Sequence, residues 1–94
     1  SGLKAEELKE ELKKDLEEKL AKTKKDINTE KDLSKKLAKL ASIYFELGKL
    51  GIIQDKEVLK NITYGILENK IDIDSSLKDL EILIRDLDIK IENF

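Results

Sequence analysis

Residues 33–47, LSKKLAKLASIYFEL, decide the fold of this 94-residue chain. Large apolar side chains recur there with spacings of four, three, four and three residues, at Leu33, Leu37, Leu40, Tyr44 and Leu47. At about 100° per residue, these positions form one stripe along an α-helix. Most of the stability of such a helix comes from packing its stripe, so the rest of the chain has to cover it.

The signals around this stretch predict a helix over residues 30–47. Thr29 with Asp32 three residues later resembles a capping box, and a break is expected at residues 26–29. Gly48 and Gly51 are expected to end the helix, since glycine tolerates the left-handed conformation found there.

Three other segments carry helical patterns. Residues 3–25 are built from strong helix formers and hold leucines at every fourth position, Leu8, Leu12, Leu16 and Leu20. Their stripe is narrow, so we expect this helix to lie on the outside of the domain and to fray. A third helix is predicted over residues 55–68 with Asp55 as its cap, and a fourth over residues 75–91 capped by Asp74 or Ser75.

The fourth segment allows two interpretations near its end. A heptad seam runs through Leu77, Leu80, Ile84, Leu87 and Ile91, which favours helix. Apolar and charged residues also alternate over residues 86–92, which is typical of a strand. We favour helix, because only the short stretch 71–74 could pair with such a strand. Four helices with short connections predict one all-α domain over residues 1–94, a compact antiparallel four-helix bundle.

The composition excludes many functions. Charged residues make up 43% of the chain, but 19 basic and 21 acidic groups leave a net charge of −2, so we expect no nucleic-acid partner. Cys and His are absent, which removes disulfides, thiol catalysis, the usual general base and the commonest metal ligand. No apolar run reaches the length of a membrane span or a signal peptide. The sequence therefore predicts no enzyme, catalytic residue, cofactor, metal or membrane partner, and it leaves the compartment undetermined.

Several large apolar residues, Leu67 among them, lie off the predicted stripes. The candidates for a partner surface are Phe45, Tyr64, Ile82 and Ile89. One interpretation is that the first helix packs over them within the chain, and we favour it because the leucines of that helix must be buried somewhere. The other is that they bind a protein partner or a second copy of the chain.

Two short stretches are similar to known families. Residues 40–50 resemble the first helix of a tetratricopeptide repeat, but no second copy follows at the required period. Residues 67–89 are similar to the end of a phage-repressor helix-turn-helix domain. That resemblance implies a recognition helix upstream, for which residues 54–69 are about one turn too short. Residues 51–94 also carry net charge −4, the wrong sign for DNA.

The chain resembles an engineered or de novo designed helical-bundle protein, with its idealised part in the first 25 residues and a natural-like sequence from residue 27 onward. Pro, Cys, Met, His and Trp are all missing, the first helix is idealised, and Ser1-Gly2 looks like a cloning remnant. We therefore expect a non-enzymatic structural or protein-binding domain, designed to realise a fold or to present a surface. The alternative is a small bacterial or viral regulatory module with a degenerate helix-turn-helix.

Overall fold

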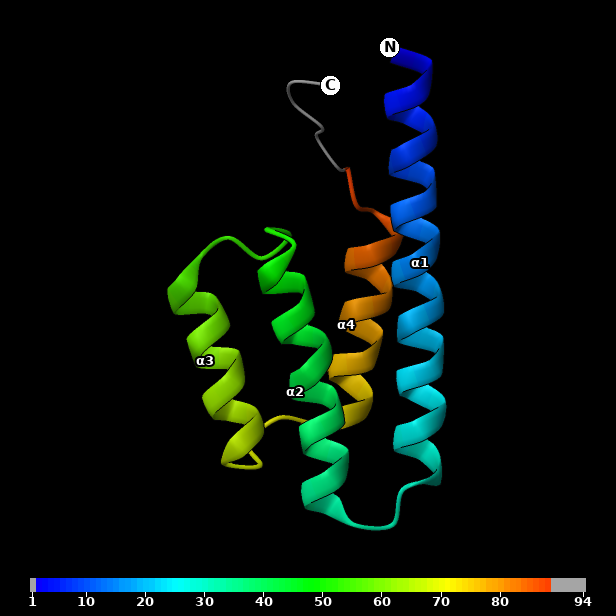
Figure 1. Ribbon diagram of the computed structural model, residues 1–94. Helices are drawn as coiled ribbons and strands as arrows, with labels where there is room; N and C mark the ends of the chain where they lie inside the picture. The colour runs from blue at the N-terminus through cyan, green and yellow to red at the C-terminus, as the bar shows by residue number, and fades with distance from the viewer. Residues whose placement is uncertain (1, 89–94) are drawn as a thin grey trace.

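A computed structural model of the protein describes residues 2–88, which form four α-helices and no strand. They are α1 (Gly2–Thr29), α2 (Leu33–Lys49), α3 (Lys56–Leu67) and α4 (Ile73–Arg85). Successive helices run in opposite directions, as Figure 1 shows. The prediction of an all-α, antiparallel four-helix bundle is thus confirmed.

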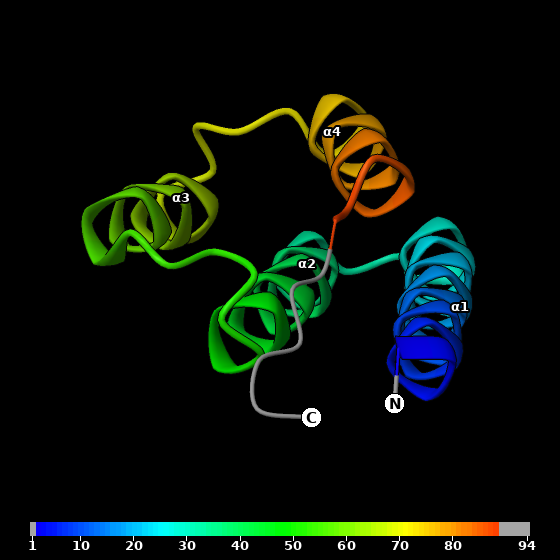
Figure 2. The ribbon, with the colours of Figure 1, turned by 90° about the horizontal axis from the view of Figure 1, so that it is seen from above.

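Helix α2 lies in the middle of the arrangement. It packs against α1 on one side and α3 on the other, while α4 packs against α1 (Figure 2). Leu40 and Leu47 of α2 are completely buried, together with Ile66 of α3. One cluster of buried side chains connects all four helices, so the domain has a single core.

Helix α1 lies at one edge of the arrangement (Figure 2), and its apolar stripe is buried from the middle of the helix onward. Leu16, Leu20 and Ile27 are buried in the core, where they face α2 and α4. Only the N-terminal part extends beyond the other helices, and Leu8 there is 38% exposed. The leucine stripe is therefore a structural part of the core from its middle onward.

The predicted break at residues 26–29 is wrong, because α1 continues to Thr29. The Thr29 hydroxyl donates to the carbonyl oxygens of Lys25 and Asp26, each at 3.2 Å, so it stays within the helix and does not cap the next one. Burial of Ile27 gives this last turn a packing contact. The cap of α2 is instead Asp32, whose carboxylate accepts the Ser34 backbone N–H at 2.9 Å.

The ends of α2 and α3 are closed in the same way. Helix α2 runs through Gly48, and the left-handed residue is Gly51, with φ +73°. The backbone N–H of Ile52 donates to the carbonyl of Leu47, which completes a Schellman motif. At the end of α3, Asn69 takes the left-handed position with φ +54°, a role that the sequence analysis did not anticipate.

Helix α4 differs from the prediction at both ends. Asp55 caps α3 as expected, but the cap of α4 is Asp72, not Asp74 or Ser75. Asp72 accepts hydrogen bonds from the hydroxyl and the backbone N–H of Ser75, and they lower the pKa of its carboxyl.

The helix ends at Arg85 and does not continue toward residue 91. Residues 86–88 are neither helix nor strand, and residues 89–91 lie outside the described range.

Two glycines allow close approaches to α3. A Cβ built on Gly48 of α2 would lie 2.7 Å from a methyl carbon of Leu59 on α3. A Cβ on Gly65 of α3 would lie 2.8 and 2.9 Å from two carbons of Ile71 in the following connection. Real Cβ atoms do not come this close, so a side chain at either position would require Leu59 or Ile71 to shift.

Replacement of Leu16 tests the role of α1. Leu16→Ala should destabilise the fold by about 3 kcal/mol, because it removes a buried side chain and leaves a cavity. The matched variant Leu8→Ala, on the same stripe but in the extending part, should cost under about 1 kcal/mol. Urea unfolding followed by circular dichroism measures both. Equally small losses of stability in the two variants would show that burial of Leu16 contributes little to the core.

A double-mutant cycle tests the contact between Gly65 and Ile71. Gly65→Ala should destabilise the protein by about 1 kcal/mol, since overpacking against Ile71 outweighs the gain of about 1 kcal/mol in helix propensity. In an Ile71→Ala background the same change should become stabilising, because the clash is gone. A stabilising Gly65→Ala in the parent protein would contradict the close approach.

Candidate functional site

Three of the four predicted partner-surface residues lie within the described range, and all three are exposed. Phe45 is 51% exposed, Tyr64 53% and Ile82 50%. Helix α1 therefore does not cover them, contrary to the interpretation that the sequence favoured. Its leucines are buried against other parts of α2 and α4. Ile89 lies outside the described residues.

The seam between α2 and α3 places two large apolar side chains on one side. Gly48 and Leu59 face each other across this seam. Phe45 lies about 60° and Leu67 about 80° around their helices from these facing residues, in the same rotational sense. Because α2 and α3 run antiparallel, side chains that are rotated from the contact in the same direction around each helix lie on the same side of the seam. Phe45 and Leu67 thus lie on the same side of the seam, with Tyr64 farther from it, about 140° around α3 from Leu59.

We call this surface, made by Phe45, Tyr64 and Leu67, the α2–α3 face. Leu67 is 67% exposed, the highest value among the exposed large apolar side chains of the described residues. The sequence placed Leu67 off the stripe of its helix, but only the packing of α3 shows that it shares a side with Phe45. The ammonium group of Lys60 lies 5.7 Å from the centre of the Tyr64 ring, close enough for a cation–π contact.

Ile82 does not belong to this face. It lies about 140° around α4 from the buried Leu77, and α4 packs against α1 rather than α3. Tyr64 and Ile82 therefore occupy separate parts of the surface, and the predicted set of candidates divides into two.

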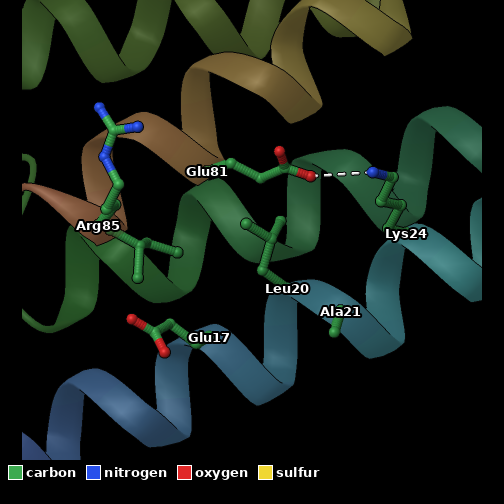
Figure 3. A pocket seen from close by; sticks show the side chains of 7 residues that line it. Glu17, Leu20, Ala21, Lys24, Glu81 and Arg85 are labelled. Carbon is green, nitrogen blue, oxygen red and sulfur yellow. Dashed lines mark hydrogen bonds and ion pairs between the residues drawn. The ribbon is translucent and has the colours of Figure 1, made fainter.

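A hollow of about 380 Å³ lies between α1 and α4. Leu20, Ala21 and Ile84 contribute apolar surface to it, and Lys24 of α1 pairs with Glu81 of α4 at 3.0 Å across its rim (Figure 3). Glu17 and Arg85 complete the lining. Of the two carboxylates that line this hollow, Glu81 forms an ion pair, with Lys24. This ion pair connects α1 with α4, and we assign it a structural role.

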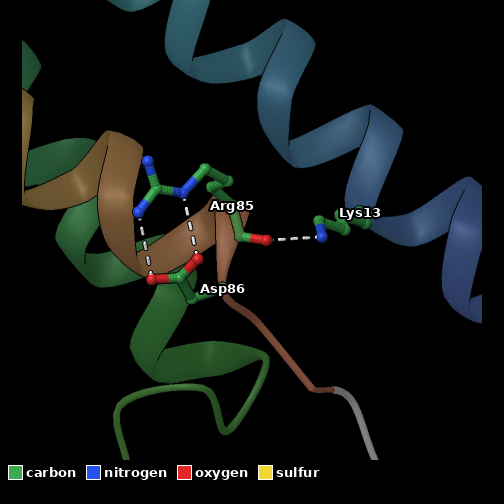
Figure 4. Close-up of polar contacts among 3 residues, drawn as sticks. All are labelled: Lys13, Arg85 and Asp86. Carbon is green, nitrogen blue, oxygen red and sulfur yellow. Dashed lines mark hydrogen bonds and ion pairs between the residues drawn. The ribbon is translucent and has the colours of Figure 1, made fainter.

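The C-terminal end of α4 is held by α1. The ammonium group of Lys13 donates to the carbonyl oxygen of Arg85, and the Arg85 guanidinium forms two hydrogen bonds with Asp86 (Figure 4). The guanidinium lowers the pKa of the Asp86 carboxyl. A cation at the last carbonyl of a helix also interacts favourably with the helix dipole. These contacts give α4 a defined end at Arg85.

Tyr44 is the one tyrosine of the core. Burial raises the pKa of its hydroxyl, and the nearby carboxylate of Asp79 raises it further, while a hydrogen bond with Ser76 opposes these effects. Because Ser76 and Asp79 belong to α4, this side chain joins α2 to α4. Tyr44 is therefore a packing residue, although it directly precedes the exposed Phe45.

No family model matches this sequence, and the searches of curated proteins and of solved structures also found no match. Within residues 2–88, no cluster of three or more acidic side chains is arranged to hold a metal ion. None of the four helices described there combines the length and the apolar character that crossing a bilayer requires.

Adjacent residues of α2 provide a test of the site's exposure. Phe45→Ala should change the free energy of unfolding by about 1 kcal/mol or less, because half of the ring is already in water. Tyr44→Ala should cost about 3 kcal/mol or more, since it empties part of the core. Chemical unfolding of both variants measures the difference. Similar losses for the two variants would place Phe45 in the core.

Proposed function

We propose that this chain is a non-enzymatic protein-binding domain and that the α2–α3 face is the surface it presents. The observation that carries this proposal is the grouping of Phe45, Leu67 and Tyr64, each more than half exposed, along one seam. Large apolar side chains clustered on the surface of a small domain are typical of interaction sites. Aromatic residues in such a cluster contribute strongly to binding energy.

The rigidity of the face supports the proposal. All three side chains project from helices, and α3 is fixed by its close contacts through Gly48 and Gly65. Both neighbouring helix ends are closed by Schellman motifs. A surface that is ordered before binding loses less conformational entropy when the partner arrives. A face of apolar side chains on two helices suits binding. Catalysis would instead require polar groups that converge on one point.

We further infer an engineered origin, because the idealised sequence of α1 and the absence of five residue types point to a chosen composition. On this interpretation the domain was made to realise the four-helix fold and to carry a surface such as the α2–α3 face. The proposal includes no cofactor, nucleic acid or membrane lipid.

A peptide-display selection against the folded protein tests the proposed function. Peptides enriched on the parent protein should lose at least about tenfold in affinity, or 1.4 kcal/mol, with Phe45→Ala or Leu67→Ala, because each removes apolar contact area. Ile82→Ala is the matched control and should leave affinity unchanged. Anisotropy titrations measure the affinities, and circular dichroism checks that each variant is folded.

Two results would contradict this function. One is a set of enriched peptides that bind Phe45→Ala and Leu67→Ala as well as they bind the parent protein. The other is a library that enriches no specific binder. In a third outcome, the face joins two copies of the chain. Light scattering would then show a dimer for the parent protein and a monomer for Phe45→Ala.

A further inference from the structure

The α2–α3 face carries a distinctive charge pattern. At 100° per residue around each helix from Gly48 and Leu59, the sector between about 20° and 140° contains the three apolar side chains of the face. The charged residues in that sector are all lysines, two from α2 and two from α3: Lys35, Lys49, Lys56 and Lys60. All four are exposed. The sector contains no Asp or Glu, although acidic groups outnumber basic ones in the chain.

Among the described residues, the nearest carboxylates form no ion pair with these lysines. Glu46 and Glu57 lie about 160° from the facing residues, just beyond the sector. Glu46 points toward α1, where it pairs with Lys19 at 2.8 Å, and that hydrogen bond lowers the pKa of its carboxyl, although the charge of Lys49 also contributes to lowering this pKa. Asp55 is occupied as the cap of α3, since it accepts the Glu57 backbone N–H at 2.9 Å.

The ion pairs of the described residues also leave the four lysines out. They use other basic groups, Lys9, Lys19, Lys24, Lys70 and Arg85. Lys60 has the ring of Tyr64 as its neighbour instead of a carboxylate. The face thus combines an apolar middle with four lysines that form no ion pair among the described residues.

We propose that the α2–α3 face binds an acidic amphipathic helix of a protein partner. This inference rests on the proposed function and names the chemistry of the partner. Apolar side chains of the partner helix pack against Phe45 and Leu67, while carboxylates beside its apolar stripe meet the lysines. A basic partner is disfavoured because it would place like charges together around the apolar contact.

The spacing of the apolar side chains fits a helix. Phe45 lies three residues before Gly48, and Leu67 lies eight residues after Leu59 on the antiparallel helix. At 1.5 Å per residue, the two are about 7.5 Å apart along the seam. One to two turns of a partner helix span this distance, so side chains at positions i, i+4 and i+7 can reach both anchors.

The apolar middle of the face favours a protein partner over a nucleic acid. Phosphate backbones are bound by continuous basic surfaces, often with arginine, whereas Phe45 and Leu67 occupy the centre here. The only arginine of the chain is Arg85, which is bound to Asp86 on α4. Duplex DNA is therefore a competing probe in the test below.

Three labelled helical peptides of about 18 residues test the proposal. The acidic probe has leucine at i, i+4 and i+7 with glutamate on both flanks. The basic probe has lysine in place of each glutamate, and the polar probe is the acidic one with alanine in place of leucine. Fluorescence anisotropy should show the acidic probe binding at least about tenfold more tightly than either other probe. Its affinity should fall as salt rises, because the charges at the rim are screened.

Charge reversal supplies the decisive comparison. Lys49→Glu with Lys60→Glu should weaken the acidic probe at least about tenfold and favour the basic one. Lys14→Glu with Lys25→Glu makes the same change in net charge on exposed positions of α1, away from the face, and should leave both affinities nearly unchanged. Circular dichroism confirms that both double variants are folded.

The other outcomes separate this inference from the proposed function. Equal binding of acidic and basic probes, both lost in Phe45→Ala, would overturn the acidic partner and retain a protein-binding face. Failure of all probes together with failure of the display selection would overturn both. Binding of duplex DNA in place of the acidic probe would identify a polyanion. A dimer that dissociates on charge reversal would identify a second copy as the occupant.

Discussion

The structure depends on the burial of α2 from several sides at once. Leu40 and Leu47 are fully buried, and Tyr44 connects the same helix to α4 through Ser76 and Asp79. A helix in this position needs apolar residues over much of its circumference, which explains why α2 has apolar residues beyond its main stripe. The other helices then have little freedom of placement, because each must cover a different part of one element.

Two glycines at the contacts of α3 bear on which of its side chains remain exposed. Gly48 lets α3 approach α2 at Leu59, and Gly65 lets Ile71 cover the other flank of α3. With α3 packed in this way, Ile66 is buried in the core, while Tyr64 and Leu67 are exposed. The candidate binding surface is thus a consequence of close packing. Ile66 is the one fully buried residue of α3, so other apolar side chains of this helix remain available for contact with another protein.

Much of the fold could be predicted because it depends on local pattern. Stripes with helical spacing located four helices, and Asp55 was recognised as a cap from its position before an apolar run. The errors lie where residues distant in the sequence meet. The last turn of α1 follows from the burial of Ile27, and the end of α4 is held by Lys13 of α1. Neither contact leaves a signal in the segment that it affects.

The sequence by itself determined the helical class, the number of helices, the balance of charge and the presence of apolar residues such as Phe45 outside the stripes. It could not decide whether those residues were covered, because coverage depends on how each helix rotates against its neighbours. Tertiary structure placed Phe45 and Leu67 on one side of the α2–α3 seam, separated both from Ile82, and brought lysines of α2 and α3 to the same face. The physical reason is that spacing along a chain fixes a side chain's position on its own helix, whereas only packing fixes where that helix faces.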